Sequence, residues 1–439
     1  MSLRKVVVLG GGAAGMSAAS RVRKLLPNTE VEVFERTYMV SHAPCAVPYF
    51  VEGLFSDTSL FMTYTPQFFE EKRKIKVNVG TEVEELDLKN RTVKVRKEGY
   101  ARSVEYDTLI VALGARPKMP FRGLRVFAAH HPFHAMELRE ALWAASTVAV
   151  VGAGILGLEM AEALVERGKK VYLIHRGKYP LSRTVDQEIG EVIGQRVRES
   201  GVDFRPGEAL KSVDEEGKIV VTDGGKYRVD ATVLAVGVEP DVTLVKGKLP
   251  IGPTGALVVD QHMRTAHPDV YGAGDVAESK NLITGAPDWQ PFAPVANKMG
   301  YVAGSNVGGM EMVFPGTVGT VVTKFKDLVI AKVGLTELEA KRAGLRTITS
   351  FVKAKTRARY YPGGKDIFVK LVAAEDGRVL GAQVAGGEEV LGRVNTVAAA
   401  LEARMTVEQL FFVEMGYLPA VSVVWDPIVI AARQIMESR

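Results

Sequence analysis

The sequence contains a single cysteine, Cys45, among its 439 residues. One thiol excludes an internal disulfide framework and any metal site built from several cysteines. An excess of one charge is also missing, because 56 Lys and Arg face 51 Asp and Glu, for a formal charge of +5. This mild balance suits anionic small molecules and is too weak to indicate a nucleic-acid surface. We therefore expect neither a metal site nor a nucleic-acid partner.

Long hydrophobic runs are also absent. A basic pair near the N-terminus leads directly into a short apolar run and glycines, which is typical of a buried strand rather than a signal peptide. No stretch approaches the ~20 apolar residues of a spanning helix. The best candidate, around residues 421–432, is interrupted by Asp426 and Pro427. We expect a cytoplasmic protein without membrane contact.

Glycine, by contrast, is abundant, with 44 residues, and two long segments repeat one pattern. Residues 5–36 and 147–176 each read as a β-branched run, a glycine loop, a helical stretch, a polar turn and a second β-branched run. This pattern predicts a βαβ unit with a right-handed crossover. Residues 106–117 and 229–240 form a second matched pair, each an apolar strand followed by glycine and proline. The order of the pairs predicts two copies of one nucleotide-binding domain.

The first glycine loop has the spacing of a dinucleotide-binding turn. Gly10 permits the tight turn out of the strand, Gly12 lets the backbone approach a pyrophosphate, and Gly15 lets helix pack on strand. The helix N-terminus then offers free N–H groups to the phosphates. Glu35 follows 20 residues after Gly15, at the end of the next strand, where a carboxylate can hold a ribose diol.

The second glycine loop differs at the end of its βαβ unit. Its glycines are Gly152, Gly154 and Gly157, and the position that matches the acidic residue of the first loop is His175, followed by Arg176. No carboxylate is available there for a ribose 2′-hydroxyl, whereas the cations suit a 2′-phosphate. We therefore favour NADPH over NADH. The alternative is that Arg176 stacks on adenine or faces solvent.

A third glycine-rich turn, YGAGDVA at residues 271–277, ends near Asp275. Such a turn can place a carboxylate beside a polyol, although an ordinary turn aspartate is an equal alternative. Arg36, Ser41 and Gly114, which flank the motifs, complete the predicted cofactor-binding set.

The order of these motifs resembles the FAD-dependent pyridine nucleotide–disulfide oxidoreductases over essentially the whole chain. Segment 41–50, SHAPCAVPYF, is similar to the active-site segment of the single-cysteine branch, which includes coenzyme A disulfide reductases, NADH oxidases and NADH peroxidases. ARYYPGG (358–364) and GYLPAVSVVWDP (416–427) resemble the coenzyme A disulfide reductases. Ala46 departs from the usual glycine after the cysteine, which leaves the preferred substrate open.

The resemblance implies an α/β fold with two doubly wound Rossmann-like domains and a C-terminal α+β dimerisation domain. The expected domains are a discontinuous FAD-binding domain (1–118 and 240–313), an NAD(P)H-binding domain (119–239) and a dimerisation domain (314–439). The residues agree with the last of these. Alternation over 317–333 and 367–385 predicts antiparallel strands, and residues 390–402 and the segment from Thr406 predict helices.

The position of Cys45 favours a redox role over that of a buried small hydrophobe. It lies ten residues beyond Glu35, and Val40 and Phe50 occupy the positions five residues away, so no CxxxxC pair exists. A single thiolate must form a disulfide with an outside thiol, a sulfenic acid or a persulfide. A helix N-terminus and a nearby flavin are expected to lower the pKa of this thiol.

The thiol released from a disulfide needs a proton, and no histidine is placed by motif for this task. His42 is close to Cys45 in sequence and is a weaker candidate. Tyr361 and Tyr417 are the predicted proton or hydrogen-bond donors, with Tyr360 in substrate binding. The resemblance implies that comparable tyrosines reach the active site from a partner subunit of a homodimer. The alternative is that they are interface residues.

Coenzyme A also carries phosphates that need cations. Arg21 and Arg23 lie on the predicted helix after the first glycine loop, and residues two apart cannot share a helix face, so at most one serves. The resemblance favours Arg21, with Arg23 second, and Lys298 is a further candidate.

Three functions remain open from the sequence. The first is an NAD(P)H-dependent reductase of coenzyme A disulfide or a related persulfide or polysulfide. The second is an NADH oxidase or peroxidase in which Cys45 cycles through a sulfenic acid. The third is a ferredoxin reductase-like or redox-responsive flavoprotein that binds a protein partner. The tyrosines and Arg21 favour the first, and the position of Cys45 argues against the third.

Overall fold

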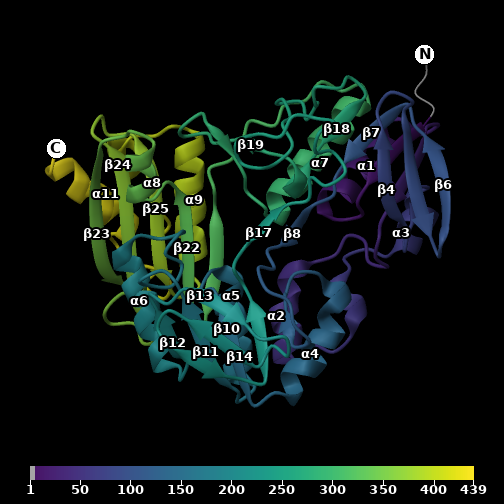
Figure 1. The fold of residues 1–439 in the computed structure, drawn as a ribbon. Helices are drawn as coiled ribbons and strands as arrows, with labels where there is room; N and C mark the ends of the chain where they lie inside the picture. Colours follow the sequence, from purple (N-terminus) through teal and green to yellow (C-terminus); the bar gives the residue numbers. More distant parts are fainter. Residues whose placement is uncertain (1–4) are drawn as a thin grey trace.

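The computed structural model describes residues 5–439, which form three sheet-centred units (Figure 1). Two units contain a five-stranded parallel sheet, and the third contains a five-stranded antiparallel sheet. The C-terminal sheet lies at the left of Figure 1, the second parallel sheet at the bottom, and the first parallel sheet at the right. This architecture confirms the predicted fold class. The predicted domain boundaries stay predictions.

The first parallel sheet contains the N-terminal glycine loop. Residues 6–9 of its central strand are fully buried because helices cover one face and an antiparallel sheet and loops cover the other. Across the sheet the strands are β18 (Val270–Gly272), β7 (Thr108–Val111), β1 (Lys5–Leu9), β2 (Glu30–Phe34) and β3 (Lys76–Asn78). The surrounding elements are α1 (Ala13–Leu25), α7 (Ala293–Val307), α3 (Pro66–Arg73), β4 (Glu82–Asp87), β5 (Thr92–Lys97) and β6 (Tyr100–Glu105).

The second parallel sheet repeats this arrangement, as the internal repeat predicts. Its strands in spatial order are β12 (Asp203–Pro206), β11 (Lys170–His175), β10 (Thr147–Val151), β16 (Ala231–Leu234) and β9 (Val126–Phe127). It is accompanied by α4 (Ala135–Ala144), α5 (Ile155–Glu166), α6 (Gln187–Glu199), β13 (Leu210–Val213), β14 (Ile219–Thr222) and β15 (Lys226–Arg228). The chain passes between the two units through β8 (Ala115–Pro117) and β17 (Val238–Pro240), which pair antiparallel.

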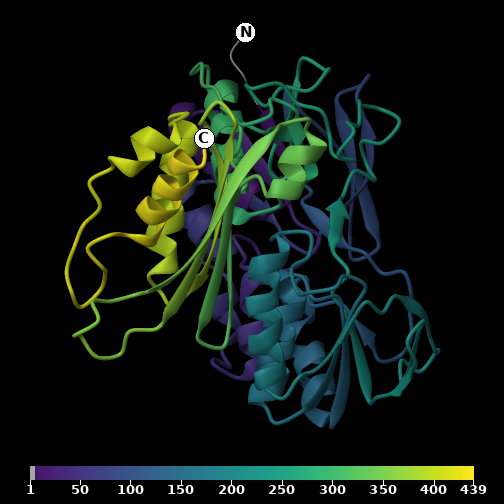
Figure 2. The same ribbon diagram turned by 90° about the vertical axis from the view of Figure 1, so that its left-hand side faces the viewer.

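The C-terminal unit is an antiparallel sheet with helices on its faces (Figure 2). Its strands in spatial order are β21 (Val321–Phe325), β22 (Leu328–Gly334), β25 (Val379–Gly386), β24 (Asp366–Ala374) and β23 (Thr347–Lys355). Its helices are α8 (Glu337–Arg342), α9 (Val390–Glu402), α10 (Val407–Phe411) and α11 (Pro427–Glu437). The predicted strands and helices of this unit are confirmed, and β23 is an additional edge strand.

The segment after Cys45 leaves the first unit and packs into the core of the second. Helix α2 (Val47–Glu52) contacts α4 and α5, and its residues Val47, Phe50 and Val51 join a buried cluster with the second sheet and with Phe325 of β21. Cys45 therefore lies where the three units meet. Within residues 5–439, no helix has the length and apolar content that a bilayer crossing requires.

Candidate active site

In the first glycine loop, two positions require glycine because a side chain would not fit, and a glycine between them faces open space. Gly10 has φ +104°, and a Cβ there would overlap the carbonyl oxygen of Ala112. A Cβ on Gly15 would overlap the carbonyl oxygen of Gly10, which sets the close approach of α1 to β1. A Cβ on Gly12 would meet nothing nearer than a ring carbon of His42 at 3.9 Å. The loop is thus a cradle whose free backbone at Gly12 fits a pyrophosphate.

Glu35 follows β2 and is buried beside this cradle. Its Oε2 accepts a hydrogen bond from the Gly11 N–H at 2.9 Å, and its Oε1 accepts from the backbone and hydroxyl of Thr37, both at 2.8 Å. These bonds fix a carboxylate at the edge of a cavity of about 340 Å³, which Arg36 also lines. Gly114, with φ +75° and open space around it, follows β7. The arrangement fits the ribose end of a flavin dinucleotide.

Asp275 occupies a 3₁₀ turn (Gly274–Val276) that packs against α7 and α1. Burial raises the pKa of its carboxyl to about 6. Gly274, with φ +78°, precedes it, and a Cβ there would press on the Cβ of Ala14 at 2.6 Å. This close packing holds the Asp275 carboxyl near the start of α1, where it suits a polyol.

Cys45 lies in a short 3₁₀ turn (Pro44–Ala46) directly before α2 and is exposed in the chain. Partial burial raises the pKa of its thiol, a hydrogen bond to its own backbone lowers it, and the charge of Glu159 raises it further. Desolvation is the largest of these effects, so the pKa of Cys45 is raised in the chain without flavin. The predicted lowering, which includes the effect of the flavin, stays a prediction.

Glu159 is a neighbour of the Cys45 segment that sequence reasoning missed. It lies on α5, which packs against α2, and its Oε1 accepts a hydrogen bond from the Thr323 hydroxyl of β21 at 2.8 Å. Burial raises the pKa of Glu159, and its charge acts on both Cys45 and Tyr49. The signal was an acidic residue two positions after Gly157, the first of three glutamates on a largely apolar helical stretch.

His42 is packed rather than placed beside the thiol. Its ring packs against that of His131 at an interplanar angle of 49° with centroids 4.3 Å apart, and burial lowers the pKa of both, that of His131 to about 3. Ser41, with φ +47°, precedes His42, and its N–H donates to the Gly11 carbonyl at 2.8 Å. These contacts tie the cysteine segment to the first glycine loop. Within residues 5–439, no group of three His, Cys, Asp or Glu residues is arranged for a metal ion.

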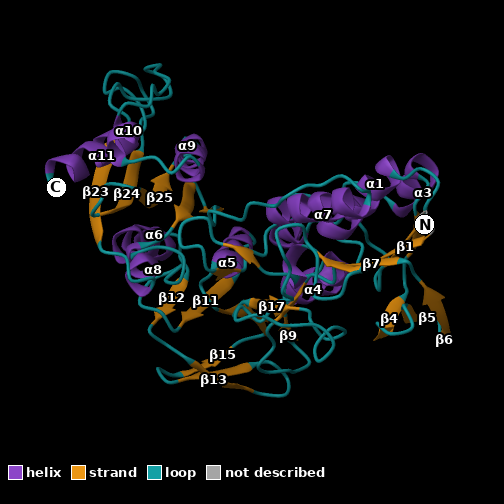
Figure 3. Cartoon of the chain, turned by 90° about the horizontal axis from the view of Figure 1, so that it is seen from above, coloured by secondary structure: helices purple, strands orange, loops and turns teal. Residues whose placement is uncertain are grey.

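The three predicted tyrosines lie on two loops of the C-terminal unit that run side by side. The hydroxyls of Tyr360 and Tyr417 are 3.3 Å apart, and the Ala358 N–H donates to the Pro419 carbonyl at 3.1 Å. Tyr361 is half exposed, with the guanidinium of Arg357 6.0 Å from its ring centroid. The loop with Tyr360 and Tyr361 joins β23 to β24, the loop with Tyr417 follows α10, and both extend away from the sheet beyond α10 (Figure 3). None of the contacts recorded for these tyrosines within residues 5–439 is with the Cys45 segment.

The predicted cations differ in how fully they are engaged. Arg21 donates to the Ser305 hydroxyl at 2.9 Å and lies over the ring of Tyr301, 4.4 Å from its centroid. Arg23 donates to the carbonyls of Pro27, at 2.7 Å, and Lys74, at 2.5 Å. Lys298 is exposed on α7, which packs against α1. Arg21 and Lys298 thus lie on adjacent helices, whereas the guanidinium of Arg23 is already hydrogen-bonded to two backbone carbonyls.

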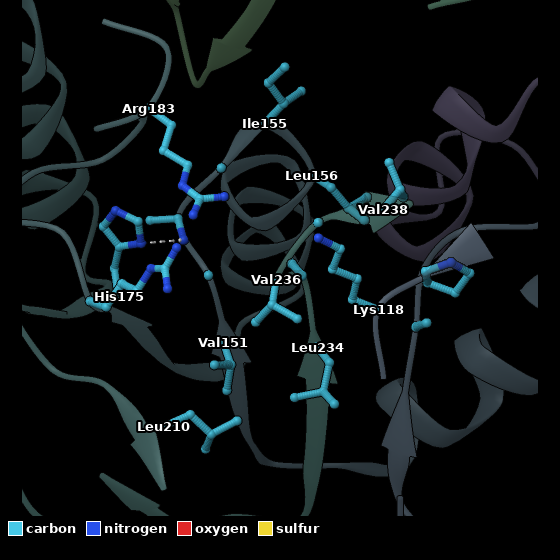
Figure 4. A pocket seen from close by; sticks show the side chains of 18 of the residues that line it. Lys118, Val151, Ile155, Leu156, His175, Arg183, Leu210, Leu234, Val236 and Val238 are labelled. Carbon is cyan, nitrogen blue, oxygen red and sulfur yellow. Dashed lines mark hydrogen bonds between the residues drawn. The ribbon is translucent and has the colours of Figure 1, made fainter. Parts of the chain in front are cut away.

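The second glycine loop opens into a cavity of about 990 Å³ (Figure 4). Gly152 and Gly157 repeat the contacts of the first loop, because a Cβ on either would overlap a backbone carbonyl oxygen. Gly154 has nothing within 4 Å of its Cβ position. The free backbone at Gly154 therefore fits a second dinucleotide in the same way.

Two arginines line this cavity, one predicted and one not. Arg176 and Arg183 are both exposed, and Figure 4 shows Arg183 and His175 on the same side of the pocket. His175 accepts a hydrogen bond from the Ala153 N–H at 3.2 Å and is 2.9 Å from the Ser182 hydroxyl. Burial, followed by the charges of the two arginines, lowers the pKa of His175 to about 4. His175 is thus neutral, and Arg176 and Arg183 are the cations on its side of the cavity, whose lining also includes Glu208 and Glu239.

Comparisons with known proteins agree with this geometry. The family model for pyridine nucleotide-disulphide oxidoreductases matches residues 4–300, and the dimerisation-domain model of the same family matches residues 320–427. The NAD(P)H coenzyme A polysulfide/persulfide reductase of Pyrococcus horikoshii is 44% identical over 440 residues, covering 98% of each chain. An NADH oxidase of Methanocaldococcus jannaschii is 33% identical over 443 residues, covering 99% of each chain.

A solved structure extends the match to three dimensions. The NAD-dependent persulfide reductase from A. fulgidus superimposes with a TM-score of 0.95 at 34% identity, covering 99% of this chain and 83% of that chain. The chain therefore belongs to the pyridine nucleotide-disulphide oxidoreductases and is an NAD(P)H-dependent, FAD-containing flavoprotein reductase.

Proposed function

We propose that the protein uses NAD(P)H to reduce coenzyme A disulfide, or a related persulfide or polysulfide, through a mixed disulfide on Cys45. The observation that carries the proposal is the place of the single thiol. It is exposed, precedes α2, and lies where the flavin cradle meets helix α5 of the dinucleotide unit. The names of the Pyrococcus and A. fulgidus relatives support the same sulfur chemistry.

The two glycine cradles divide the cofactors between them. Gly12 and Glu35 would hold the FAD pyrophosphate and ribose, and Gly154 with the cavity beside it would hold the nicotinamide dinucleotide. Bound flavin supplies the two-electron link between a reduced nicotinamide and the cysteine sulfur. The segment that holds Cys45 is tied to the first cradle through the Ser41 N–H and the Gly11 carbonyl.

The Cys45 thiolate attacks one sulfur of the substrate disulfide. A sulfur–sulfur bond forms to Cys45, the substrate bond breaks, and the other sulfur leaves as a thiolate that takes one proton. Two electrons and a second proton then return Cys45 to its thiolate and release the second thiol. Across the cycle, one NAD(P)H and one proton convert one disulfide to two thiols.

The proton reaches the leaving sulfur from Tyr361 or Tyr417 of a second subunit. Both are exposed on loops of the C-terminal unit, and the segment that carries Tyr417 also carries the exposed aromatic residues Phe412 and Trp425. Exposed aromatic side chains on a matched dimerisation domain favour burial against another copy of the chain. Within the same subunit, Glu159 adjusts the charge around Cys45.

Arg21 and Lys298 are the proposed contacts for the coenzyme A phosphates. Arg23 has a structural role, because it binds backbone carbonyls near the end of α1. NADPH is the preferred reductant, because Arg176 and Arg183 offer two cations and His175 adds no negative charge. A 2′-phosphate on the adenosine ribose would pair with these arginines.

Reduction of oxygen through a Cys45 sulfenic acid is the second candidate. The 33% identity to an NADH oxidase favours it, and the same thiol would serve both reactions. The absence of a histidine aimed at Cys45 within the described residues weighs against a peroxidase, because His42 is packed on His131.

Anaerobic turnover with NADPH tests the proposal. Coenzyme A disulfide, polysulfide and, in a separate aerobic assay, oxygen are compared as acceptors for the wild type and Cys45→Ser. We expect fast reduction of coenzyme A disulfide that depends on Cys45. Faster reduction of oxygen that persists in Cys45→Ser would contradict the mixed-disulfide mechanism and favour a flavin oxidase.

A further inference from the structure

The loop that carries the two cavity arginines, residues 176–186, is held in a defined turn. Leu181 has φ +56°, a left-handed conformation that few non-glycine residues adopt, and its side chain is 2% exposed. Its N–H donates to the Ala153 carbonyl at 2.8 Å, and its carbonyl accepts from Thr184 and Val185 at 2.6 and 2.9 Å. Arg183 therefore projects from a turn with little freedom of its own.

This turn ends at Asp186, which lies at the N-cap position of α6 and yet does not cap it. An aspartate at an N-cap normally accepts hydrogen bonds from the first turn of its own helix. Here its Oδ2 instead accepts from the Gln383 side chain at 2.6 Å and from the Glu337 N–H at 3.0 Å. Gln383 also accepts from the Asp186 N–H at 2.6 Å. Residues of the C-terminal unit thus bind both the backbone N–H and the carboxylate of Asp186.

A buried lysine adds ion pairs to these hydrogen bonds. Lys370 of β24 is 2% exposed, and its Nζ lies 2.9 Å from both Glu188 and Glu337 and 3.4 Å from Asp186. Burial alone would lower its pKa, but the carboxylates around it raise the pKa above its ordinary value, so Lys370 is charged. An ion this deeply buried is stable only while all its partners stay in place. The network therefore fixes the end of the loop relative to the C-terminal sheet.

We infer that Gln383 and Lys370 are positioning residues for dinucleotide recognition, which act across the boundary between units through Asp186. They fix the turn so that Arg183, three residues before Asp186, faces the cavity with Arg176. The inference rests on the proposed preference for NADPH. A plain brace between two units would stabilise the protein without discriminating between ligands, whereas a positioning role concerns the 2′-phosphate in particular.

Two adenosine nucleotides separate these roles, because 2′,5′-ADP and 5′-AMP differ only in the 2′-phosphate. Their dissociation constants are measured by calorimetry on the flavin-containing enzyme, with no sulfur substrate present. Gln383→Met removes both hydrogen bonds to Asp186 without leaving a charge unpaired, and Lys370→Met is the stronger perturbation. Arg183→Ala gives the full loss of affinity for 2′,5′-ADP that is expected when the arginine is absent.

Arg393→Met is the matched control, because Arg393 is also a buried cation of the C-terminal unit, lies on α9 and pairs with Asp426 at 3.0 Å rather than with the loop. We expect Gln383→Met to weaken binding of 2′,5′-ADP about fivefold to tenfold, part of the ~10-fold or more that one charge-assisted contact supplies. The affinity for 5′-AMP should change less than twofold, and Arg393→Met should alter neither affinity.

Equal losses for both nucleotides, or none in Gln383→Met, would overturn the positioning role while leaving the NADPH preference intact. A wild type that binds 2′,5′-ADP no more tightly than 5′-AMP would refute that preference and the positioning role together. If Lys370→Met fails to fold, Gln383→Met still decides the question, since it changes no charge.

Discussion

Gly12 and Gly15 lie three residues apart in one loop, and the structure predicts opposite consequences for replacing them with alanine. A methyl on Gly15 would overlap the Gly10 carbonyl oxygen, so α1 must move away from β1. Overpacking of this kind costs ~1–3 kcal/mol, which lowers Tm by roughly 2–12 °C for a domain of this size. Gly12 has φ −72°, which alanine adopts freely, and its nearest neighbour is 3.9 Å away. Gly12→Ala should therefore keep or slightly raise the stability of the flavin-free protein.

The cost of Gly12→Ala should appear only when flavin binds. The methyl would stand where the backbone approaches the pyrophosphate, and losing one charge-assisted hydrogen bond of ~1.5–3 kcal/mol weakens binding by about 10- to 150-fold. Thermal unfolding of the flavin-free protein and fluorescence titration with FAD measure the two effects separately. Unchanged stability in Gly15→Ala, or full FAD affinity in Gly12→Ala, would refute the assignment of the two glycines.

Three further predictions concern charge. Arg176→Ala and Arg183→Ala should each raise KM for NADPH about 5- to 30-fold and KM for NADH less than threefold, because exposed charge-assisted contacts supply ~1–2 kcal/mol; equal effects on both would count against a 2′-phosphate site. Since folded His131 has a pKa of about 3, the unfolded chain binds more protons as the pH falls below ~6.5, and urea unfolding should show a loss of about 2 kcal/mol between pH 7.5 and 5 that His131→Gln removes. Because the charge of Glu159 raises the pKa of Cys45, Glu159→Gln should move the pH profile of Cys45 alkylation by iodoacetamide to lower pH; a move to higher pH would show that Glu159 acts otherwise.

The features that depend on local spacing could be predicted from the sequence. The two βαβ repeats, the required glycines and the helix at Val390–Glu402 each depend on residues close together in the chain. Strand β23 was not predicted. It lies at the sheet edge, where Ile348, Val352 and Ala354 pack on the core but Ser350 interrupts this apolar face. Lys353 and Lys355 on the strand form ion pairs with Asp366, so the apolar alternation is weaker than in the central strands.

The features missed in the site depend on contacts between distant segments. Glu159 matters because α2 crosses from the flavin unit to pack on α5, and no periodicity in either segment shows that contact. Arg183 enters the cavity because Leu181 adopts a left-handed turn, which no local residue pattern predicts. The raised pKa of Cys45 in the chain without flavin also depends on packing, because desolvation is its largest cause.

The central claim is that Cys45 forms a mixed disulfide with coenzyme A, and mass spectrometry of the trapped enzyme tests it most directly. The reduced protein is mixed with coenzyme A disulfide under anaerobic conditions without further NADPH, quenched in acid and digested. The account predicts that the peptide containing Cys45 carries one coenzyme A moiety, which a reducing agent removes and which Cys45→Ser lacks. A peptide that carries only a sulfenic or sulfinic acid, or no modification while coenzyme A disulfide is still consumed, would contradict the account.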